Sequence, residues 1–394
     1  MDILGLYVHV PFCTTKCGYC DFYSVPLRGR AVGQVVRAMI REAEIRALSV
    51  DIGPDTVMLG GGTPTVLPDS ELQGLLTAIQ RHFPTDCLRE FTVEANPANL
   101  DASRARLLRE LGADRVSIGA QSFQPRDLAV LERDHEPATI QKAVRAARGA
   151  GFRSLNLDLI FGIPGQTLAG WLDTLRRALD LGSDHLSCYG LTYEPGTSLT
   201  GRRDSGHVQP CDEQLEADMF CATIDALTAA GFEHYEISNY ARPGQRCLHN
   251  LSYWHNRPYV GIGPSAASYL HGERTRNVPD VDRYVELIDH TGDATEEREQ
   301  LDTLARAGET AMLGLRMTRG IDVVDFQRRT GFDPRVLFRT AIRHFQSLGL
   351  LECVVAAGNA GCPTEYVRLT REGLLKANTV MAQFVNPDPP PAGG

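Results

Sequence analysis

The sequence predicts an α/β fold, a partial (β/α)6 barrel followed by a small helical domain of winged-helix type. Short β-type runs alternate with amphipathic helical stretches up to about residue 230, and helices then surround a β-type pair beyond residue 300. Such alternation predicts a parallel sheet with helices packed outside it. Six units are too few for a closed eight-stranded barrel, so an open barrel is favoured and a doubly wound sheet is the alternative.

The predicted strands are short apolar runs: Leu6–Val10, Thr56–Leu59, Glu90–Val93, Arg115–Ile118, Ser154–Ile160 and His185–Leu191. The predicted helices have apolar residues at helical spacing: Gly33–Leu48, Asp69–His82, Ala102–Leu111, Pro137–Ala150, Leu168–Leu181 and Asp212–Ala230. Asp69 stands before leucines at helical spacing, which predicts a capped amphipathic helix. Glycines follow four of these helices, as C-terminal stop signals do: Gly112, Gly151, Gly182 and Gly231.

The change of pattern near residue 300 divides the chain. We expect a barrel over 1–240, a connecting segment over 241–298, a winged-helix-like domain over 299–385 and a disordered tail over 386–394. The third part carries four helical stretches and a β-type pair: Glu299–Leu315, Val323–Thr330, Pro334–Leu348, Glu372–Phe384, Leu351–Ala356 and Tyr366–Leu369. No basic recognition helix stands out in it, which favours a packing or lid role.

Composition excludes several classes of function. The formal charge of −9 gives no support for nucleic-acid binding, which favours basic surfaces. No apolar run approaches the length of a membrane span, and the N-terminus lacks the pattern of a secretory signal. Seven of the ten cysteines are scattered and form no framework, so reduced thiols and a cytoplasmic location are expected.

The other three cysteines form a C-x3-C-x2-C triplet, Cys13, Cys17 and Cys20, directly after the first predicted strand. Thiolates are soft ligands that suit zinc or an iron–sulfur cluster. Zinc sites usually pair two such motifs or add histidines, and no second pair follows here. Three thiolates on one loop can hold three corners of a [4Fe–4S] cube and leave one iron open. A structural zinc site and three ordinary cysteines are the weaker alternatives.

Polar and glycine residues gather at the carboxyl ends of the predicted strands, the edge where β/α barrels place active sites. The second strand ends in Gly60-Gly61-Gly62-Thr63-Pro64, whose bare backbone lets a ligand approach main-chain groups. The other positions are Glu94, Gln121, Arg133 and Asp158. Together they predict a polar pocket, with acceptors suited to a ribose or an amine and a cation suited to a carboxylate.

These motifs together resemble the radical S-adenosylmethionine (radical SAM) superfamily. Within it, Y-V-H-V-P-F-C, S-I-G-A-Q-S-F and N-L-D-L-I-F-G-I-P-G-Q resemble the family of oxygen-independent coproporphyrinogen III dehydrogenase and heme chaperones of the HemW type. The resemblance covers most of the chain. It implies a [4Fe–4S] cluster whose open iron binds S-adenosylmethionine (SAM) and cleaves it reductively to a 5′-deoxyadenosyl radical.

Carried over position by position, the resemblance assigns the cluster to Cys13, Cys17 and Cys20. It assigns the SAM site to Tyr7, Tyr19, Gly61, Gly62, Thr63, Glu94, Gln121, Arg133 and Asp158. No residue is assigned a catalytic role of its own, because the cofactor supplies the chemistry and the protein orients and shields it. An electron donor such as a flavodoxin or ferredoxin is implied as a partner.

Two departures favour the heme chaperones over the dehydrogenase. The dehydrogenase has a fourth cysteine where this chain has Phe22, and it has a long N-terminal extension where twelve residues precede Cys13 here. His249-Asn250-Leu251-Ser252-Tyr253-Trp254 matches the H-N-x-x-Y-W motif of HemW. It makes His249, Tyr253 and Trp254 the candidate heme residues, with His249 as a hypothetical axial ligand.

The sequence therefore predicts a heme chaperone that binds heme and passes it to a hemoprotein. The alternative is a radical SAM enzyme that oxidatively decarboxylates coproporphyrinogen III or a related substrate. Whether the chain is an enzyme stays open between these two readings. From residue chemistry alone, without the resemblance, the His249 motif is a polar turn with an aromatic packing anchor.

Overall fold

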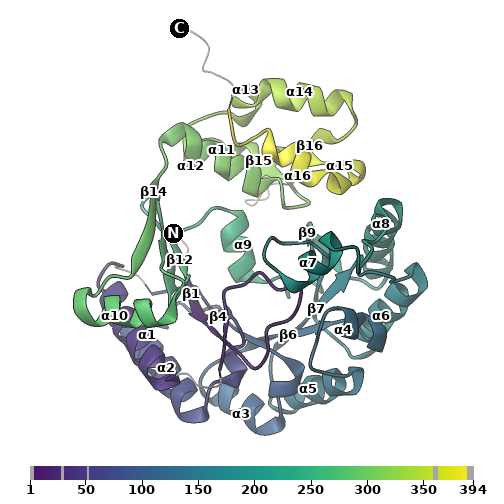
Figure 1. Cartoon of the computed structure of the whole chain (residues 1–394). Helices are drawn as coiled ribbons and strands as arrows, with labels where there is room; N and C mark the ends of the chain where they lie inside the picture. Colours follow the sequence, from purple (N-terminus) through teal and green to yellow (C-terminus); the bar gives the residue numbers. More distant parts are fainter. Residues whose placement is uncertain (1–3, 28–30, 51–52, 358–362, 388–394) are drawn as a thin grey trace.

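A computed structural model of the chain describes residues 4–27, 31–50, 53–357 and 363–387. Within these residues the main sheet contains twelve strands, ordered β14-β13-β12-β11-β1-β4-β5-β6-β7-β8-β10-β9. Its centre is parallel from β11 through β1 to β8, and both flanks are antiparallel. Helices cover the outer face of the parallel part in an arc (Figure 1). The partial barrel predicted from the sequence is thereby confirmed.

The six predicted strands are the six parallel strands from β1 to β8. Their bounds are β1 Gly5–Val10, β4 Thr56–Gly61, β5 Glu90–Ala95, β6 Arg115–Gln121, β7 Ser154–Phe161 and β8 His185–Gly190. The crossover helices are α1 Val32–Ala47, α2 Asp69–His82, α3 Ala102–Glu110, α5 Pro137–Gly149, α6 Leu168–Asp180 and α8 Glu213–Ala229. Strands buried on both faces read as continuous apolar runs, which is why the sequence marks them clearly.

The predicted signals at helix ends are confirmed at the C-termini but not at Asp69. Gly112, Gly151, Gly182 and Gly231 all have positive φ just after their helices, so the predicted stop signals are confirmed. The predicted cap at Asp69 is wrong: Pro68 occupies the N-cap position, and no side chain caps this helix. Asp69 is instead the first helical residue, where its charge still complements the helix dipole.

The segment 241–298 is more than the connection that the sequence predicts, because it extends the main sheet past β1. It contributes β11 Tyr259–Ile262, β12 Ala267–Leu270, β13 Glu273–Asn277 and β14 Thr295–Gln300, with α9 Leu248–Trp254 before them and α10 Val281–Thr291 between the last two. The outer strands β13 and β14 read ERTRN and TEEREQ. Such polar edge strands lack the apolar alternation that identifies a strand in sequence.

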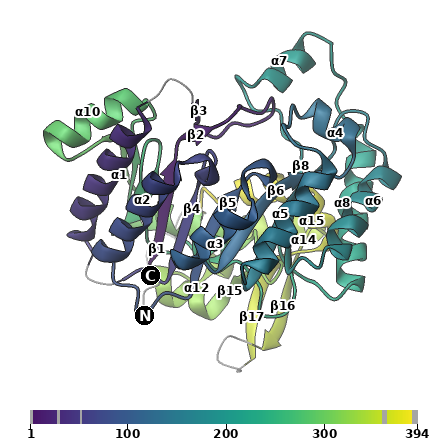
Figure 2. The same ribbon diagram turned by 90° about the horizontal axis from the view of Figure 1, so that it is seen from below.

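Shorter elements complete the barrel. These are β2 Phe12–Cys13, β3 Val25–Pro26, α4 Pro125–Val130, α7 Ser198–Asp204, β9 Glu233–Glu236 and β10 Asn239–Ala241. The loop between β2 and β3 reaches towards α7 (Figure 2), where the Leu199 amide donates to the Gly18 carbonyl at 2.7 Å. None of the described helices combines the length and apolarity needed to cross a membrane.

The C-terminal part has its own apolar core, built around Phe326, Phe338, Phe345 and Phe384. Its elements are α11 Thr303–Gly314, β15 Ile321–Asp322, α12 Val323–Thr330, α13 Pro334–Leu337, α14 Arg339–Ser347, β16 Leu351–Ala357, β17 Pro363–Leu369, α15 Arg371–Leu375 and α16 Ala377–Ala382. Helices around a three-stranded sheet agree with the winged-helix-like prediction. The predicted disordered tail lies, from residue 388 on, outside the described residues.

Helix α9 lies between the barrel and the C-terminal part (Figure 1). Just after α9, the side-chain Nδ2 of Asn256 donates to two residues of α11, to Glu309 Oε2 at 3.1 Å and to Thr310 Oγ1 at 3.0 Å. A second contact joins Ile237 N to the Arg316 carbonyl at 3.0 Å. Asn256 therefore ties the end of the segment carrying the His249 motif to α11, and Ile237 ties the barrel to the C-terminal part.

Candidate functional site

The three thiols of the triplet lie at the carboxyl edge of the sheet: Cys13 ends β2, and Cys17 and Cys20 stand on the loop between β2 and β3. All three are half-buried, and the described cysteines are free thiols. The Cys20 amide donates to the Cys17 carbonyl at 3.2 Å, which turns the loop back on itself. Cys13 Sγ lies 3.5 Å from Thr63 Oγ1, and Arg133 Nη1 donates to Cys17 Sγ at 3.2 Å.

This donor set fits an iron–sulfur cluster. Burial raises the pKa of the Cys17 thiol, and the Arg133 guanidinium opposes that rise by favouring the thiolate that binds iron. Among the described residues, no three His, Cys, Asp or Glu side chains converge on one point that a single metal ion could occupy. A cubane takes its thiolates on separate irons, so a triplet spread around a loop suits a cluster.

The glycines at the end of β4 allow close packing of protein groups. A Cβ on Gly60 would stand 2.7 Å from Glu94 Oε2, and one on Gly61, which has φ +105°, would stand 2.7 Å from His9 Nδ1. The amide of Gly61 donates to Glu94 Oε2 at 3.2 Å, and those of Gly62 and Thr63 donate to the carbonyls of Val10 and Phe12. Bare backbone is therefore needed here to pack Glu94 and His9, and the N–H groups are engaged within the chain, whereas the predicted approach of a ligand to this backbone stays a prediction.

Two carboxylates of the parallel strands lie close enough to influence each other electrostatically. Glu94 and Asp158 are half-buried on β5 and β7. Burial, and secondarily Asp158, raise the pKa of Glu94 to about 8. Burial also raises the pKa of Asp158, although Ser117 Oγ at 2.9 Å and Asn156 Nδ2 at 2.9 Å donate hydrogen bonds to it. Acceptors of this kind suit the hydroxyl and amine donors of a nucleoside cosubstrate.

Gln121 and Arg133 meet beside the thiolate loop. Gln121 has φ +64° at a bulge in the pairing of β6 with β7, a conformation that costs an ordinary residue on the order of 1 kcal/mol or more. Arg133 Nη2 donates to the Gly119 carbonyl at 2.9 Å, and its Nε is buried without a partner. An acceptor group on a ligand would satisfy the unpaired N–H donor of Arg133.

The two tyrosines assigned to SAM flank this site. Tyr19, on the thiolate loop, has its pKa raised by burial and lies near Arg133 and Asp158. The Tyr7 hydroxyl is 3.0 Å from His9 Nδ1, while His9 Nε2 is 2.9 Å from the Tyr23 carbonyl. A carbonyl only accepts, so Nε2 carries the proton and the Tyr7 hydroxyl donates to Nδ1. The structure thus brings the predicted cofactor residues to one edge.

The candidate heme residues do not all meet. His249 is fully buried, with Nδ1 2.9 Å from Thr56 Oγ1 and Nε2 2.9 Å from the Tyr253 hydroxyl. Burial lowers the pKa of His249 to about 3, so the ring is neutral. Neither ring nitrogen is free for iron in this structure. Trp254 points elsewhere, with the Arg316 guanidinium 4.3 Å above its ring.

Helix α9 is placed by a buried carboxylate at the start of β5. Glu90 accepts hydrogen bonds from the amides of Leu248 at 2.8 Å and His249 at 3.0 Å. Arg115 Nε lies 3.9 Å from the same carboxylate and balances its charge. The anchor fixes the turn of α9 that presents Tyr253.

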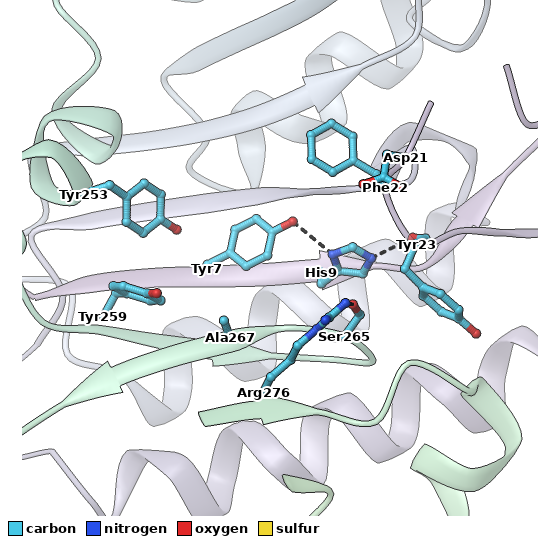
Figure 3. A pocket seen from close by; sticks show the side chains of 10 residues that line it. All are labelled: Tyr7, His9, Asp21, Phe22, Tyr23, Tyr253, Tyr259, Ser265, Ala267 and Arg276. Atoms are coloured by element: carbon cyan, nitrogen blue, oxygen red, sulfur yellow. Dashed lines mark hydrogen bonds between the residues drawn. The ribbon is translucent and has the colours of Figure 1, made fainter. Parts of the chain in front are cut away.

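Tyr253 lines a cavity of about 300 Å³ between β1 and the added strands, which we call the aromatic pocket. Figure 3 shows Tyr253 and Tyr259 at one end, Ser265 and Arg276 beside His9 at the other, and Tyr7 between them. The Tyr253 and Tyr259 rings meet edge to face at 4.9 Å between centroids. The remaining lining residues are Asp21, Phe22, Tyr23 and Ala267.

Most of this lining escaped the sequence prediction. His9 was detectable, because it follows Tyr7 by two residues in one strand and therefore shares its face. Tyr259 and Arg276 were not, because they stand on β11 and β13, which carry no clear strand signal. Phe22 was noted only for replacing a cysteine, yet it is 68% exposed at the rim of the aromatic pocket.

Comparisons with known proteins agree with this architecture. The radical SAM superfamily model matches residues 7–178, and the HemN C-terminal domain model matches residues 301–353. The solved structure of Escherichia coli coproporphyrinogen III oxidase (HemN) superposes with a TM-score of 0.83 at 23% identity, covering 97% of this chain and 90% of that one. The fold and the thiolate loop are those of a radical SAM protein, so the cofactors are a [4Fe–4S] cluster and SAM.

Sequence relatives narrow the class further. The heme chaperone HemW of Bacillus subtilis is 34% identical over 382 residues, which cover 96% of this chain and 98% of the relative. HemW of E. coli is 41% identical over 274 residues, covering 69% of this chain and 70% of the relative. The chain belongs to the HemW family.

Proposed function

We propose that this protein is a heme chaperone that binds heme in the aromatic pocket and transfers it to a hemoprotein. The observation that carries the proposal is a ring-lined cavity directly beside the cluster loop, with Tyr7, Tyr253 and Tyr259 along it. Aromatic faces suit a flat macrocycle. The names of its relatives agree with this reading.

Cys13, Cys17 and Cys20 hold the cluster in this proposal, and the SAM site lies between Glu94 and Arg133. Tyr19, Gln121 and Asp158 complete the polar lining, and the Gly61-Gly62-Thr63 turn forms its floor. Thr14, Thr15 and Lys16 are exposed on the cluster loop, which gives an electron donor such as a flavodoxin or ferredoxin access to the cluster. Free thiols support a cytoplasmic location.

Tyr253 is the member of the His249 motif that faces heme in this proposal, and His249 supports it from behind. The His249–Tyr253 hydrogen bond would have to break before His249 could ligate iron. A cavity of about 300 Å³ is at the small end for a ligand site, so part of the macrocycle remains outside. Partial exposure suits a carrier that releases its cargo.

The test is anaerobic reconstitution of the full chain, followed by two assays on the same sample. We expect stable heme binding by absorbance titration, and no steady conversion of coproporphyrinogen III with SAM and a reductant. Turnover of that substrate without heme binding would establish the dehydrogenase reading instead. Phe22, in place of the dehydrogenase's additional cysteine, favours the chaperone.

A further inference from the structure

Arg276 is the cation of the aromatic pocket. It lies on β13, and its Nη2 donates to Ser265 Oγ at 3.0 Å, which orients the guanidinium. Its nearest carboxylate is Glu297 Oε1 at 3.7 Å, in a pair whose side chains are 47% and 63% exposed. Exposed pairs of this kind contribute about 0–1 kcal/mol, so Glu297 is a weak competitor for the guanidinium.

The pocket leaves room beside this guanidinium. In the register of β12 with β13, Ala267 stands directly opposite Arg276, and it offers only a methyl group. Ala267 also lines the pocket, so the space next to Arg276 opens into the cavity rather than into the core. Of the five N–H donors of the planar guanidinium, one is taken by Ser265, and the other four remain for a ligand acceptor.

Arg276 is the charged group that stands next to this space. His9, the other basic residue of the lining, is neutral because its two nitrogens are engaged by Tyr7 and Tyr23 and burial lowers its pKa to about 4. Asp21 is the acidic residue of the lining, and Figure 3 shows it on the far side of the His9 ring from Arg276. A ligand with an aromatic body and a carboxylate would therefore place the carboxylate at Arg276.

We propose that Arg276, oriented by Ser265, is the subsite that binds a propionate carboxylate of the tetrapyrrole. The inference rests on the proposed heme-binding function and adds to it a residue that recognises the acid. Guanidinium and carboxylate pair through two parallel N–H···O bonds, which also fixes the orientation of the ring in the pocket. The macrocycle then lies with its propionate edge towards β13 and its opposite edge towards Tyr253.

The test compares heme with heme dimethyl ester, in which both carboxylates are masked, on the reconstituted full chain. The wild type should bind heme at least about tenfold more tightly than the ester, since a hydrogen-bonded charge contributes about 1.5–3 kcal/mol. Arg276→Gln should lose this preference and keep the ester affinity within about twofold, because the ester offers no carboxylate to pair with the guanidinium. Arg276→Lys should retain part of the preference, since it keeps the charge without the fork.

The matched control is Arg298→Gln on the neighbouring strand β14. Arg298 is 59% exposed and pairs with Glu273 and Asp293, away from the pocket lining. The Arg298→Gln protein should prefer heme over the dimethyl ester to the same extent as the wild type. An Arg276→Gln protein that keeps the preference, or that loses heme and ester affinity equally, would overturn the carboxylate subsite. Failure of the wild type to bind heme would instead overturn the proposed function.

Discussion

Strand β1 separates two sites of opposite character. On one side, the thiolate loop, Arg133, Glu94 and Asp158 form a charged site whose members perturb one another's pKa values. On the other side, the aromatic pocket is built of rings, with Arg276 as its cation. Tyr7 lies between them, lining the pocket while its hydroxyl bonds to His9. The charged site suits a small zwitterionic cosubstrate, and the aromatic pocket suits a large flat ligand.

The difference teaches that one barrel edge can support two ligands whose requirements conflict. A flat macrocycle needs broad apolar ring faces, whereas a zwitterionic cosubstrate needs charged and polar partners for the groups that it buries. Placing the second site on strands added beyond β1 resolves the conflict. Each side can then be changed separately, which is the basis of the following predictions.

The largest effect is expected on the charged side. Cys17→Ser should abolish the cluster, because an alcohol replaces the thiolate that binds iron, and iron and sulfide in the reconstituted protein should fall to background. Cys87→Ser is the control, since Cys87 is exposed and lies outside the triplet. Retention of the full iron content in Cys17→Ser would rule out the assigned ligand set.

The second largest effect is expected in the aromatic pocket. It distinguishes a His249 that ligates the heme iron from a His249 that only holds Tyr253 in place. Tyr253→Phe removes the hydroxyl that bonds to His249, and it should weaken heme binding by about fivefold, the value of one hydrogen bond. His249→Ala should show a loss of similar or larger size with the wild-type heme spectrum. A changed iron spectrum in His249→Ala, absent in Tyr253→Phe, would make His249 the axial ligand.

The smallest effect is a pH dependence on the charged side. The pKa of Glu94 is raised to about 8 in the folded chain, from an ordinary value near 4.5. The Glu94 carboxyl therefore ionises at a lower pH in the unfolded chain than in the folded one. The free energy of unfolding of the wild type, relative to that of Glu94→Gln, should fall as the pH rises from about 5 to 8. Because Glu94 is half-buried, we expect a change on the order of 1 kcal/mol.

The measurement is the thermal midpoint of anaerobic, SAM-free protein across this pH range. The control is Glu110→Gln, at an exposed position on α3, which should follow the wild type at every pH. Parallel curves for Glu94→Gln and the wild type would show that the carboxyl of Glu94 has an ordinary pKa.

The sequence predicts the charged side better than the aromatic one, for a physical reason. Buried parallel strands are continuous apolar runs, so a polar residue such as Glu94 or Asp158 at their ends is conspicuous. The strand that carries Tyr259, β11, has only four residues and pairs with one parallel and one antiparallel neighbour, while the strand that carries Arg276, β13, is antiparallel and polar. Sequence spacing also cannot show that both nitrogens of His249 are engaged, because Thr56 comes from a distant strand.

The most direct test of the two-site account titrates SAM and heme separately into reconstituted Glu94→Gln and Tyr253→Leu. Glu94→Gln should weaken SAM about tenfold and leave heme unchanged, because it replaces a carboxyl group of the SAM site with an amide and alters no residue of the aromatic pocket. Tyr253→Leu should weaken heme about tenfold through loss of a ring and its hydroxyl, and leave SAM unchanged. If either variant loses affinity for SAM and for heme to the same extent, the two ligands share a single site and the two-site account is contradicted.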